Sequence, residues 1–183
     1  ACADMISKSY ASNPKKSLPI IITRFANIFG PGQMNFSALI PDCIRSSLKY
    51  SKFEPRGNGK DTRDFLFVED VAEIYEILAR ELSNNKNLSG HIFNAGTNEI
   101  FKVEDIIKKI YIKNKNKKDL IEILSKLPTK KTKGEIKDQL MTYDKLYKFF
   151  KWKPKTTFDK GLDKTLNWYK KFLKYDSDNF TSS

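Results

Sequence analysis

The chain has 183 residues and a net charge of +12, with 39% hydrophobic and 31% charged residues. This mixture excludes an intrinsically disordered chain and predicts a soluble globular protein of one domain or part of one. The sequence contains no apolar run long enough to span a bilayer, and its N-terminus lacks the basic-then-apolar pattern of a secretory signal. We therefore expect a cytoplasmic protein with no membrane partner.

The cysteines and the single histidine predict no special chemistry. Cys2 and Cys43 are too few for a disulfide scaffold and lack the spacing of metal ligands. We expect both to be small buried residues in a reducing compartment. His91 has no partner histidines or cysteines near it in sequence, so we expect a structural strand residue and no metal site.

The positive charge is concentrated in the second half of the chain. Residues 1–100 hold 12 Lys and Arg against 11 Asp and Glu, whereas residues 101–183 hold 22 against 11. Such asymmetry can mark a nucleic-acid-binding surface around Lys108 to Lys133. However, the excess is almost all Lys, and no Arg follows Arg80. We therefore favour a solvated lysine-rich face and keep a nucleic-acid-binding module as an alternative.

Helical and strand patterns alternate in the first hundred residues. Helices are expected over 1–13, 36–50 and 68–82, and strands over 18–22, 65–68 and 91–95. The continuous apolar run 18–22 is typical of a strand that is buried on both faces of a parallel sheet. The alternation predicts an α/β fold.

The second half predicts a smaller mixed α/β cap. Helices are expected over 103–113, 143–150 and 158–173, with a strand over 120–124 and a lysine-rich loop over 128–138. We divide the chain into residues 1–100, a cap over 101–174, and a disordered tail over 175–183.

Three polar residues are candidates for ligand binding. Asn27 directly follows a predicted strand, and parallel α/β sheets bind ligands at the carboxyl ends of their strands. Its amide suits a phosphate oxygen or a sugar hydroxyl, although a purely structural role in the following turn is equally compatible. Arg63, flanked by Asp61 and Asp64, is either a surface ion pair or a fork for a diphosphate. Arg56, beside a Gly-Asn-Gly turn, could stack on a planar base.

Ordered motifs carry a family resemblance. The series Arg-x-x-Asn-x-x-Gly-Pro (24–31), Leu-Ile-Pro (39–41) and Arg-Asp-Phe-Leu-Phe-Val-Glu-Asp-Val-Ala (63–72) resembles the NAD-dependent epimerase/dehydratase family of extended short-chain dehydrogenases/reductases. A later pattern, Trp-Lys-Pro (152–154) with Gly-Leu (161–162) and Trp-Tyr (168–169), resembles the family's terminal motif, so we expect the match to run to about Leu173.

The resemblance implies a fold and a set of site residues. It implies the C-terminal part of a Rossmann-type parallel sheet with a substrate-binding cap. Asn27 and Arg63 would hold a nucleotide diphosphate, and Leu39 and Arg56 would flank the base. Glu135 would reach a sugar hydroxyl. Phe25 and Asn27 would border the nicotinamide of NAD, the implied cofactor.

The resemblance also implies what the chain lacks. No Gly-x-x-Gly-x-x-Gly turn for a dinucleotide pyrophosphate is present. The family's catalytic Tyr-x-x-x-Lys is expected just before Ala1, so we expect no catalytic residue within these 183 residues and an inactive isolated chain. A homodimer of the full-length protein is also implied.

Within the family, three segments resemble the 4,6-dehydratases of CDP-glucose, which form CDP-4-keto-6-deoxyglucose by NAD-dependent hydride transfer and water elimination. They are residues 1–4, 35–42 and 134–139. An epimerase acting on a UDP- or GDP-sugar remains an alternative, because both classes share the main motifs. A non-catalytic member that binds no nucleotide is a further one.

Overall fold

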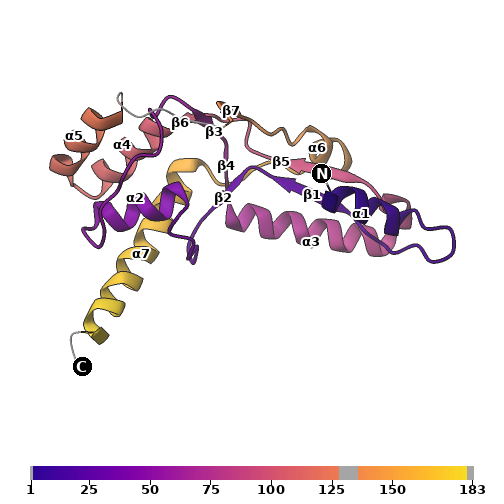
Figure 1. Ribbon diagram of the computed structural model, residues 1–183. Coiled ribbons are helices and arrows are strands. Elements are labelled where there is room, and N and C mark those ends of the chain that lie inside the picture. Colours follow the sequence, from indigo (N-terminus) through magenta and orange to yellow (C-terminus); the bar gives the residue numbers. More distant parts are fainter. Residues whose placement is uncertain (1, 128–135, 181–183) are drawn as a thin grey trace.

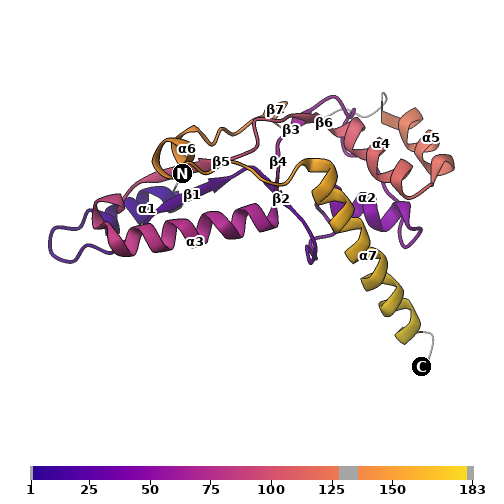
Figure 2. The ribbon, with the colours of Figure 1, turned by 180° about the vertical axis from the view of Figure 1, so that it is seen from behind.

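The computed structural model describes residues 2–127 and 136–180. The chain forms two connected regions, a sheet region with α1 and α3 and a cap region with α2, α4 and α5 (Figures 1 and 2). A small three-stranded sheet lies between them. None of the helices in the described residues is long and apolar enough to cross a membrane.

The sheet region is built on parallel strands, as predicted. Strand β1 (Ile22–Phe25) pairs in parallel with β5 (Ile92–Ala95), and β2 (Asn27–Phe29) pairs in parallel with β4 (Phe65–Phe67). Helix α3 (Val68–Asn84) packs its buried stripe against these strands. The predicted α/β fold is confirmed.

The predicted strand over 18–22 begins later than expected. Only Ile22 belongs to β1, and Leu18 is exposed. The backbone before Ile22 forms hydrogen bonds outside the sheet instead: the Leu18 amide donates to the carbonyl of Tyr10, a helical residue, and the Ile20 amide donates to Ser89 Oγ. The apolar run 18–22 therefore does not show which of its residues belong to the sheet.

Helix α1 (Cys2–Ala11) lies against β1 at the edge of this region (Figure 1). Arg24 of β1 forms an ion pair with Asp4 of α1, which fastens the helix to the strand. Cys2 is exposed on this helix, so its predicted burial is wrong, whereas Cys43 in α2 is fully buried as predicted. His91 precedes β5 and packs against the rings of Phe93 and Phe149.

The small sheet connects the two regions through short strands that sequence patterning did not indicate. Strand β3 (Thr62–Arg63) lies between β6 (Phe101–Lys102), which is antiparallel to it, and β7 (Asp138–Gln139), which is parallel. Arg63 is therefore opposite Gln139, more than seventy residues away in sequence. Two-residue strands carry no periodicity, so only the folded chain reveals them.

The cap packs helices around a continuous apolar core. It comprises α2 (Leu39–Ser47), α4 (Val103–Lys113), α5 (Lys117–Lys126) and the first half of α7 (Phe158–Phe180). A short 3-10 turn (Lys86–Leu88) and α6 (Asp144–Phe150) lie beside the sheet region. Gly161 of α7 is required at its position, because a Cβ there would lie 2.7 Å from Phe67 Cδ2 and 2.8 Å from Phe29 Cζ.

Two predictions for the second half are wrong. Residues 120–124 form part of helix α5, because Asn116 caps the helix and Leu120, Ile123 and Leu127 bury one face at helical spacing. Helix α7 continues through Phe180, so residues 175–180 of the predicted disordered tail are helical. The predicted lysine-rich loop lies mostly within 128–135, which is outside the described residues.

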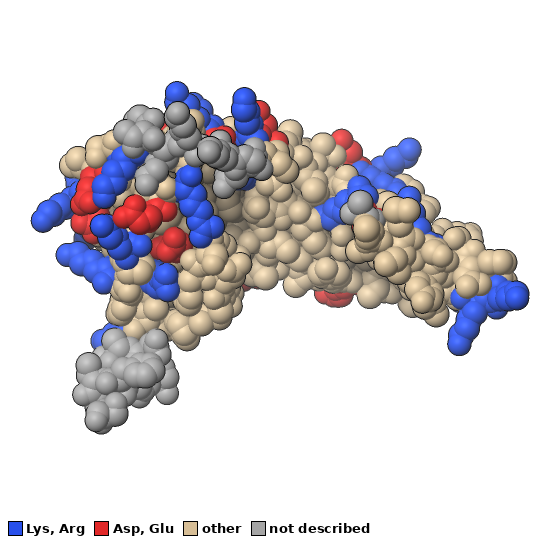
Figure 3. Space-filling view, viewed as in Figure 1, with Lys and Arg blue, Asp and Glu red and all other residues tan. Residues whose placement is uncertain are grey.

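Lysines and acidic residues alternate over the cap surface (Figure 3). Lys109 and Lys113 of α4 reach across to Asp159 and Asp163 of α7, with N–O distances of 3.0 Å and 2.6 Å. Lys164 of α7 pairs with Glu69 of α3 in the same way. Part of the lysine-rich face thus forms ion pairs between helices in addition to being solvated.

Candidate functional site

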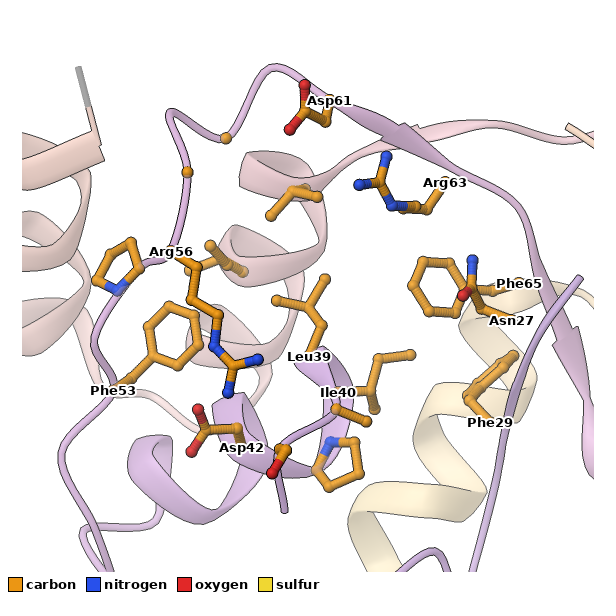
Figure 4. A pocket seen from close by; sticks show the side chains of 18 of the residues that line it. Asn27, Phe29, Leu39, Ile40, Asp42, Phe53, Arg56, Asp61, Arg63 and Phe65 are labelled. Atoms are coloured by element: carbon orange, nitrogen blue, oxygen red, sulfur yellow. The ribbon is translucent and has the colours of Figure 1, made fainter. Parts of the chain in front are cut away.

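A pocket of about 580 Å³ lies where the cap meets the sheet region. It is lined by the ends of β1 and β2, the N-terminal turn of α2, the segment 53–65 and one side of α4. This volume is within the range of small-molecule sites in proteins. Figure 4 shows a polar end with Asn27 and Arg63, and a second end with Arg56 and Asp42, separated by Leu39 and Ile40.

The pocket collects five of the six residues that the sequence singled out. Its lining includes Phe25, Asn27, Leu39, Arg56 and Arg63. These residues are separated by up to 38 positions in sequence, and the folded chain brings them around one space. The sixth, Glu135, lies outside the described residues.

Arg63 is held in place by backbone carbonyls. Its Nη1 donates to the Thr62 carbonyl at 2.8 Å and to the Lys137 carbonyl at 3.3 Å. These bonds fix the direction of a half-buried guanidinium whose side chain lines the pocket. A planar cation held in this way is suited to the oxygens of a phosphate or diphosphate.

Asp64 is a structural centre that the sequence interpretation missed. Its position next to Arg63 in the sequence favours a surface ion pair, but its side chain is fully buried. Its carboxylate accepts hydrogen bonds from Thr97 Oγ1 at 2.6 Å, from the Thr97 amide at 3.1 Å and from the Met141 amide at 3.3 Å. Gly96 is needed beside it, because a Cβ there would collide with the carboxylate and with the Met141 carbonyl.

Asp64 thereby ties together three chain segments next to the pocket. Its carbonyl oxygen accepts from the Asn27 backbone amide at 3.1 Å and from Asn27 Nδ2 at 3.0 Å. The residue lies between Arg63 of β3 and Phe65 of β4, so both pocket residues depend on its position. The sequence gives no sign that Asp64 is buried. An Asp next to an Arg is ordinarily interpreted as half of a surface ion pair.

The opposite end of the pocket combines apolar walls with two charges. Leu39 and Phe53 lie beside the Arg56 side chain, and the Arg56 guanidinium faces Asp42 (Figure 4). Burial raises the pKa of Asp42, an effect opposed by Arg45, whose Nη2 is 3.5 Å from the carboxylate, and by Arg56. A flat ring that entered between Leu39 and Arg56 would have apolar and cationic surfaces to contact.

One wall of the pocket is fastened to the C-terminal helix. Tyr169 of α7 donates its hydroxyl hydrogen to the Gln33 carbonyl, and its ring packs against Phe36. Gln33 and Ser37 both line the pocket. Burial raises the pKa of Tyr169 to about 12, so the hydroxyl remains a donor at neutral pH.

The Tyr-x-x-x-Lys spacing occurs twice in the chain, at Tyr111/Lys115 and at Tyr147/Lys151. Neither tyrosine lines the pocket. Tyr111 is fully buried in the cap, where its hydroxyl donates to Ser46 Oγ at 2.8 Å and burial raises its pKa. Tyr147 is exposed on α6, with the Lys151 ammonium 5.3 Å from the centre of its ring. Neither pair is therefore placed to contact a ligand in the pocket.

Residues 1–96, just over half of the chain, match the model of the NAD dependent epimerase/dehydratase family. The chain belongs to this family. The match lies in the N-terminal part of the chain, not the C-terminal part. The match to the model thus ends well before Leu173, whereas the alignment with a relative extends over 170 residues of the chain, as the motif at 152–169 predicted.

Three relatives show which members of this epimerase/dehydratase family the chain resembles. It is 31% identical over 170 residues to a trifunctional UDP-glucose 4,6-dehydratase/UDP-4-keto-6-deoxy-D-glucose 3,5-epimerase/UDP-4-keto-L-rhamnose-reductase of Arabidopsis thaliana, covering 92% of this chain and 23% of that protein. It is 29% identical over 154 residues to the dTDP-glucose 4,6-dehydratase of Escherichia coli, covering 83% and 41%. The crystal structure of dTDP-glucose 4,6-dehydratase from Bacillus anthracis in complex with NAD superposes with a TM-score of 0.70 and 29% identity, covering 92% and 49%.

The chain spans less than half of the length of each of these relatives. Phe25 and Asn27 line the pocket, and the sequence contains no Gly-x-x-Gly-x-x-Gly turn of the kind that surrounds a dinucleotide pyrophosphate. The homologues are NAD-dependent sugar-nucleotide dehydratases and epimerases, and they lend no support to a nucleic-acid-binding module.

Proposed function

We propose that this chain supplies the nucleotide-sugar-binding site of an NAD-dependent 4,6-dehydratase, with CDP-glucose as the substrate and CDP-4-keto-6-deoxyglucose as the product. The carrying observation is the pocket that brings together Asn27, Arg63, Leu39 and Arg56. A diphosphate would lie at Arg63, and the base would lie between Leu39 and Arg56. Glu135 would contact the sugar.

The charge distribution of the pocket supports this orientation. The two arginines that line it stand at opposite ends, with apolar residues between them (Figure 4). Arg63 is anchored by two carbonyls, which hold its guanidinium in one direction before a ligand binds. Arg56 is exposed and lies beside Phe53, as a residue that covers a base would.

The role of these residues in the reaction would be binding and orientation. Holding the diphosphate and the base fixes where the sugar ring lies relative to the reacting groups. NAD, when bound, would supply the hydride chemistry of the reaction. The described pocket contains no tyrosine and no lysine, so we expect the proton transfers to depend on residues other than those that line it.

Calorimetric titration of the chain with CDP-glucose, UDP-glucose and dTDP-glucose tests the proposal. We expect binding of all three in the micromolar to millimolar range, with CDP-glucose the tightest. Arg80→Ala, on the exposed face of α3, is the matched control for replacing Arg56 or Arg63 by Ala. A chain that binds none of the three sugars would refute the proposed site, and a preference for dTDP-glucose or UDP-glucose would refute only the choice of base.

An epimerase acting on a UDP- or GDP-sugar is the second candidate, because the family description includes both reactions. Tighter binding of UDP-glucose or a GDP-sugar than of CDP-glucose would favour it. We also propose that the isolated chain is inactive, and that the full-length protein is a cytoplasmic homodimer. Formation of a 4-keto product by the purified chain with CDP-glucose and NAD would contradict the first of these statements.

A further inference from the structure

The hydrogen bonds of Asn27 determine which end of its amide faces the ligand. Its side chain meets the Asp64 carbonyl oxygen at 3.0 Å. A carbonyl oxygen can only accept, so the Asn27 atom at this contact must be the NH₂ nitrogen. The Asn27 backbone amide donates to the same oxygen at 3.1 Å, which holds the residue in this arrangement.

The second hydrogen of the same nitrogen is also used. Asn27 Nδ2 donates to Gln139 Oε1 at 3.2 Å. An amide nitrogen carries two hydrogens, so both donors of the side chain are engaged within the protein. Among residues 2–127 and 136–180, none donates to Asn27 Oδ1. The group that this pocket residue offers to a ligand is therefore an acceptor.

The backbone around Gln139 is held in place by contacts that do not involve Asn27. Gln139 lies in β7, where the parallel pairing with β3 places it opposite Arg63. Two residues later, the Met141 amide donates to the buried Asp64 carboxylate at 3.3 Å. The backbone of Gln139 is thus anchored beside Arg63, and its side-chain oxygen Oε1 meets Asn27 Nδ2.

The amide oxygen of Asn27 cannot form a hydrogen bond with a phosphate. Phosphate oxygens at neutral pH accept hydrogen bonds, and a carbonyl oxygen has no hydrogen to give them. A hydroxyl group can donate to a carbonyl oxygen. Resting on the proposed function of the pocket, we infer that Gln139 is a positioning residue that turns Asn27 so that its amide oxygen accepts a hydrogen bond from a hydroxyl group of the ligand's sugar. Arg63 holds the diphosphate without Asn27, contrary to the sequence-based expectation.

The test is the ratio of two dissociation constants, for a nucleoside diphosphate and for its glucose ester, in each of the pairs CDP/CDP-glucose, UDP/UDP-glucose and dTDP/dTDP-glucose. In the unaltered chain the sugar tightens binding about 5- to 10-fold, the size of one hydrogen bond. Asn27→Ala and Gln139→Met lose this gain and change the affinity for the nucleoside diphosphate less than about twofold.

Two further variants separate positioning from a loss of structure. Gln139→Glu keeps an acceptor oxygen opposite Asn27. It therefore retains the ratio of the two dissociation constants, even though its added charge weakens the binding of both ligands. Arg63→Ala weakens both ligands equally and leaves the ratio unchanged. Asn94→Ala, at an exposed position of β5, behaves like the unaltered chain.

Each contrary outcome has a distinct meaning. If Asn27→Ala weakens CDP as much as CDP-glucose, Asn27 contacts the diphosphate and the inference fails. If Gln139→Met retains the ratio, Gln139 does not position Asn27. If the unaltered chain binds the nucleoside diphosphate and its glucose ester equally tightly, only this inference is overturned. If the chain binds no nucleotide, the proposed function is overturned as well.

Discussion

Charged residues serve opposite purposes in the two regions of this molecule. Beside the pocket, Asp64 and Arg63 bond mainly to backbone groups and hold chain segments in place. On the cap, Lys109 and Lys113 bond to carboxylates of a neighbouring helix at exposed positions. Burial explains the difference, because a buried charge without partners is costly, whereas an exposed charge keeps its water when a partner is lost. Residues 101–183 hold most of the net charge, whereas the junction beside the pocket depends most strongly on individual charges.

The largest effect is expected at Asp64. Asp64→Ala leaves the Thr97 amide, the Thr97 hydroxyl and the Met141 amide without their acceptor in a buried place. We expect the free energy of unfolding to fall by about 3 kcal/mol. Urea denaturation measures this as a lower midpoint with an unchanged slope. Asp61→Ala, three residues earlier and only half-buried, should change stability by less than about 0.5 kcal/mol. Equal effects of the two would remove the distinction between the regions.

Arg63 is expected to affect binding more than folding. Arg63→Ala should weaken nucleotide-sugar binding about 10- to 100-fold, since a hydrogen bond to a charged group contributes about 1.5 to 3 kcal/mol. Arg63→Lys should restore only part of the loss, because an ammonium cannot reproduce the two-pronged geometry of a guanidinium. Calorimetric titration measures both variants. Full affinity in Arg63→Ala would show that the pocket binds its ligand elsewhere.

Tyr169 connects the C-terminal helix to the pocket wall. Tyr169→Phe removes its bond to Gln33 and should cost about 1 kcal/mol at neutral pH. Because burial raises the pKa of Tyr169 from 10.0 to about 12, the folded state holds this proton more tightly than the unfolded state. The resulting stabilisation is present below pH 10 and is lost as the pH rises to about 12. Denaturation between pH 8 and pH 12 should show a smaller alkaline decline in the Phe variant. Identical declines would contradict the shift.

The smallest effect is expected on the cap. Lys113→Ala removes an ion pair with Asp163 whose carboxylate is more than half exposed. The loss should be below about 0.5 kcal/mol, and added salt should reduce it further. Thermal unfolding at low and high salt measures both quantities. A loss comparable to that of Asp64→Ala would mean that the bond between α4 and α7 is as important as the buried junction.

Long periodic segments could be predicted from the sequence, and short or ambiguous ones could not. The apolar stripe of α3 and the bounds of α4 (Val103–Lys113) were predicted because several turns repeat the same spacing. The sequence predicts a strand over residues 120–124, because five residues of mixed polarity fit helical and strand periodicity equally well when the capping residue before them is not recognised. The capping bond of Asn116 and the burial of Leu127 made them helical.

The candidate site divides in the same manner. Motif order in the sequence identified Phe25, Asn27, Leu39, Arg56 and Arg63, all of which line the pocket. It did not identify Asp64 or Gln139, whose importance arises from contacts with Thr97, Met141 and Asn27. These partners are between 33 and 112 positions away in sequence.

The fold class, the family and the residue types available for binding could be inferred without a structure, because they follow from local periodicity and ordered motifs. The tertiary structure alone decided where each charge lies and which atom each side chain presents. The amide of Asn27 illustrates the reason: its chemistry allows either end to face a ligand, and only the Asp64 carbonyl and Gln139 determine which end does. Hydrogen bonds between distant segments depend on the position of every intervening element, so no local pattern could specify them.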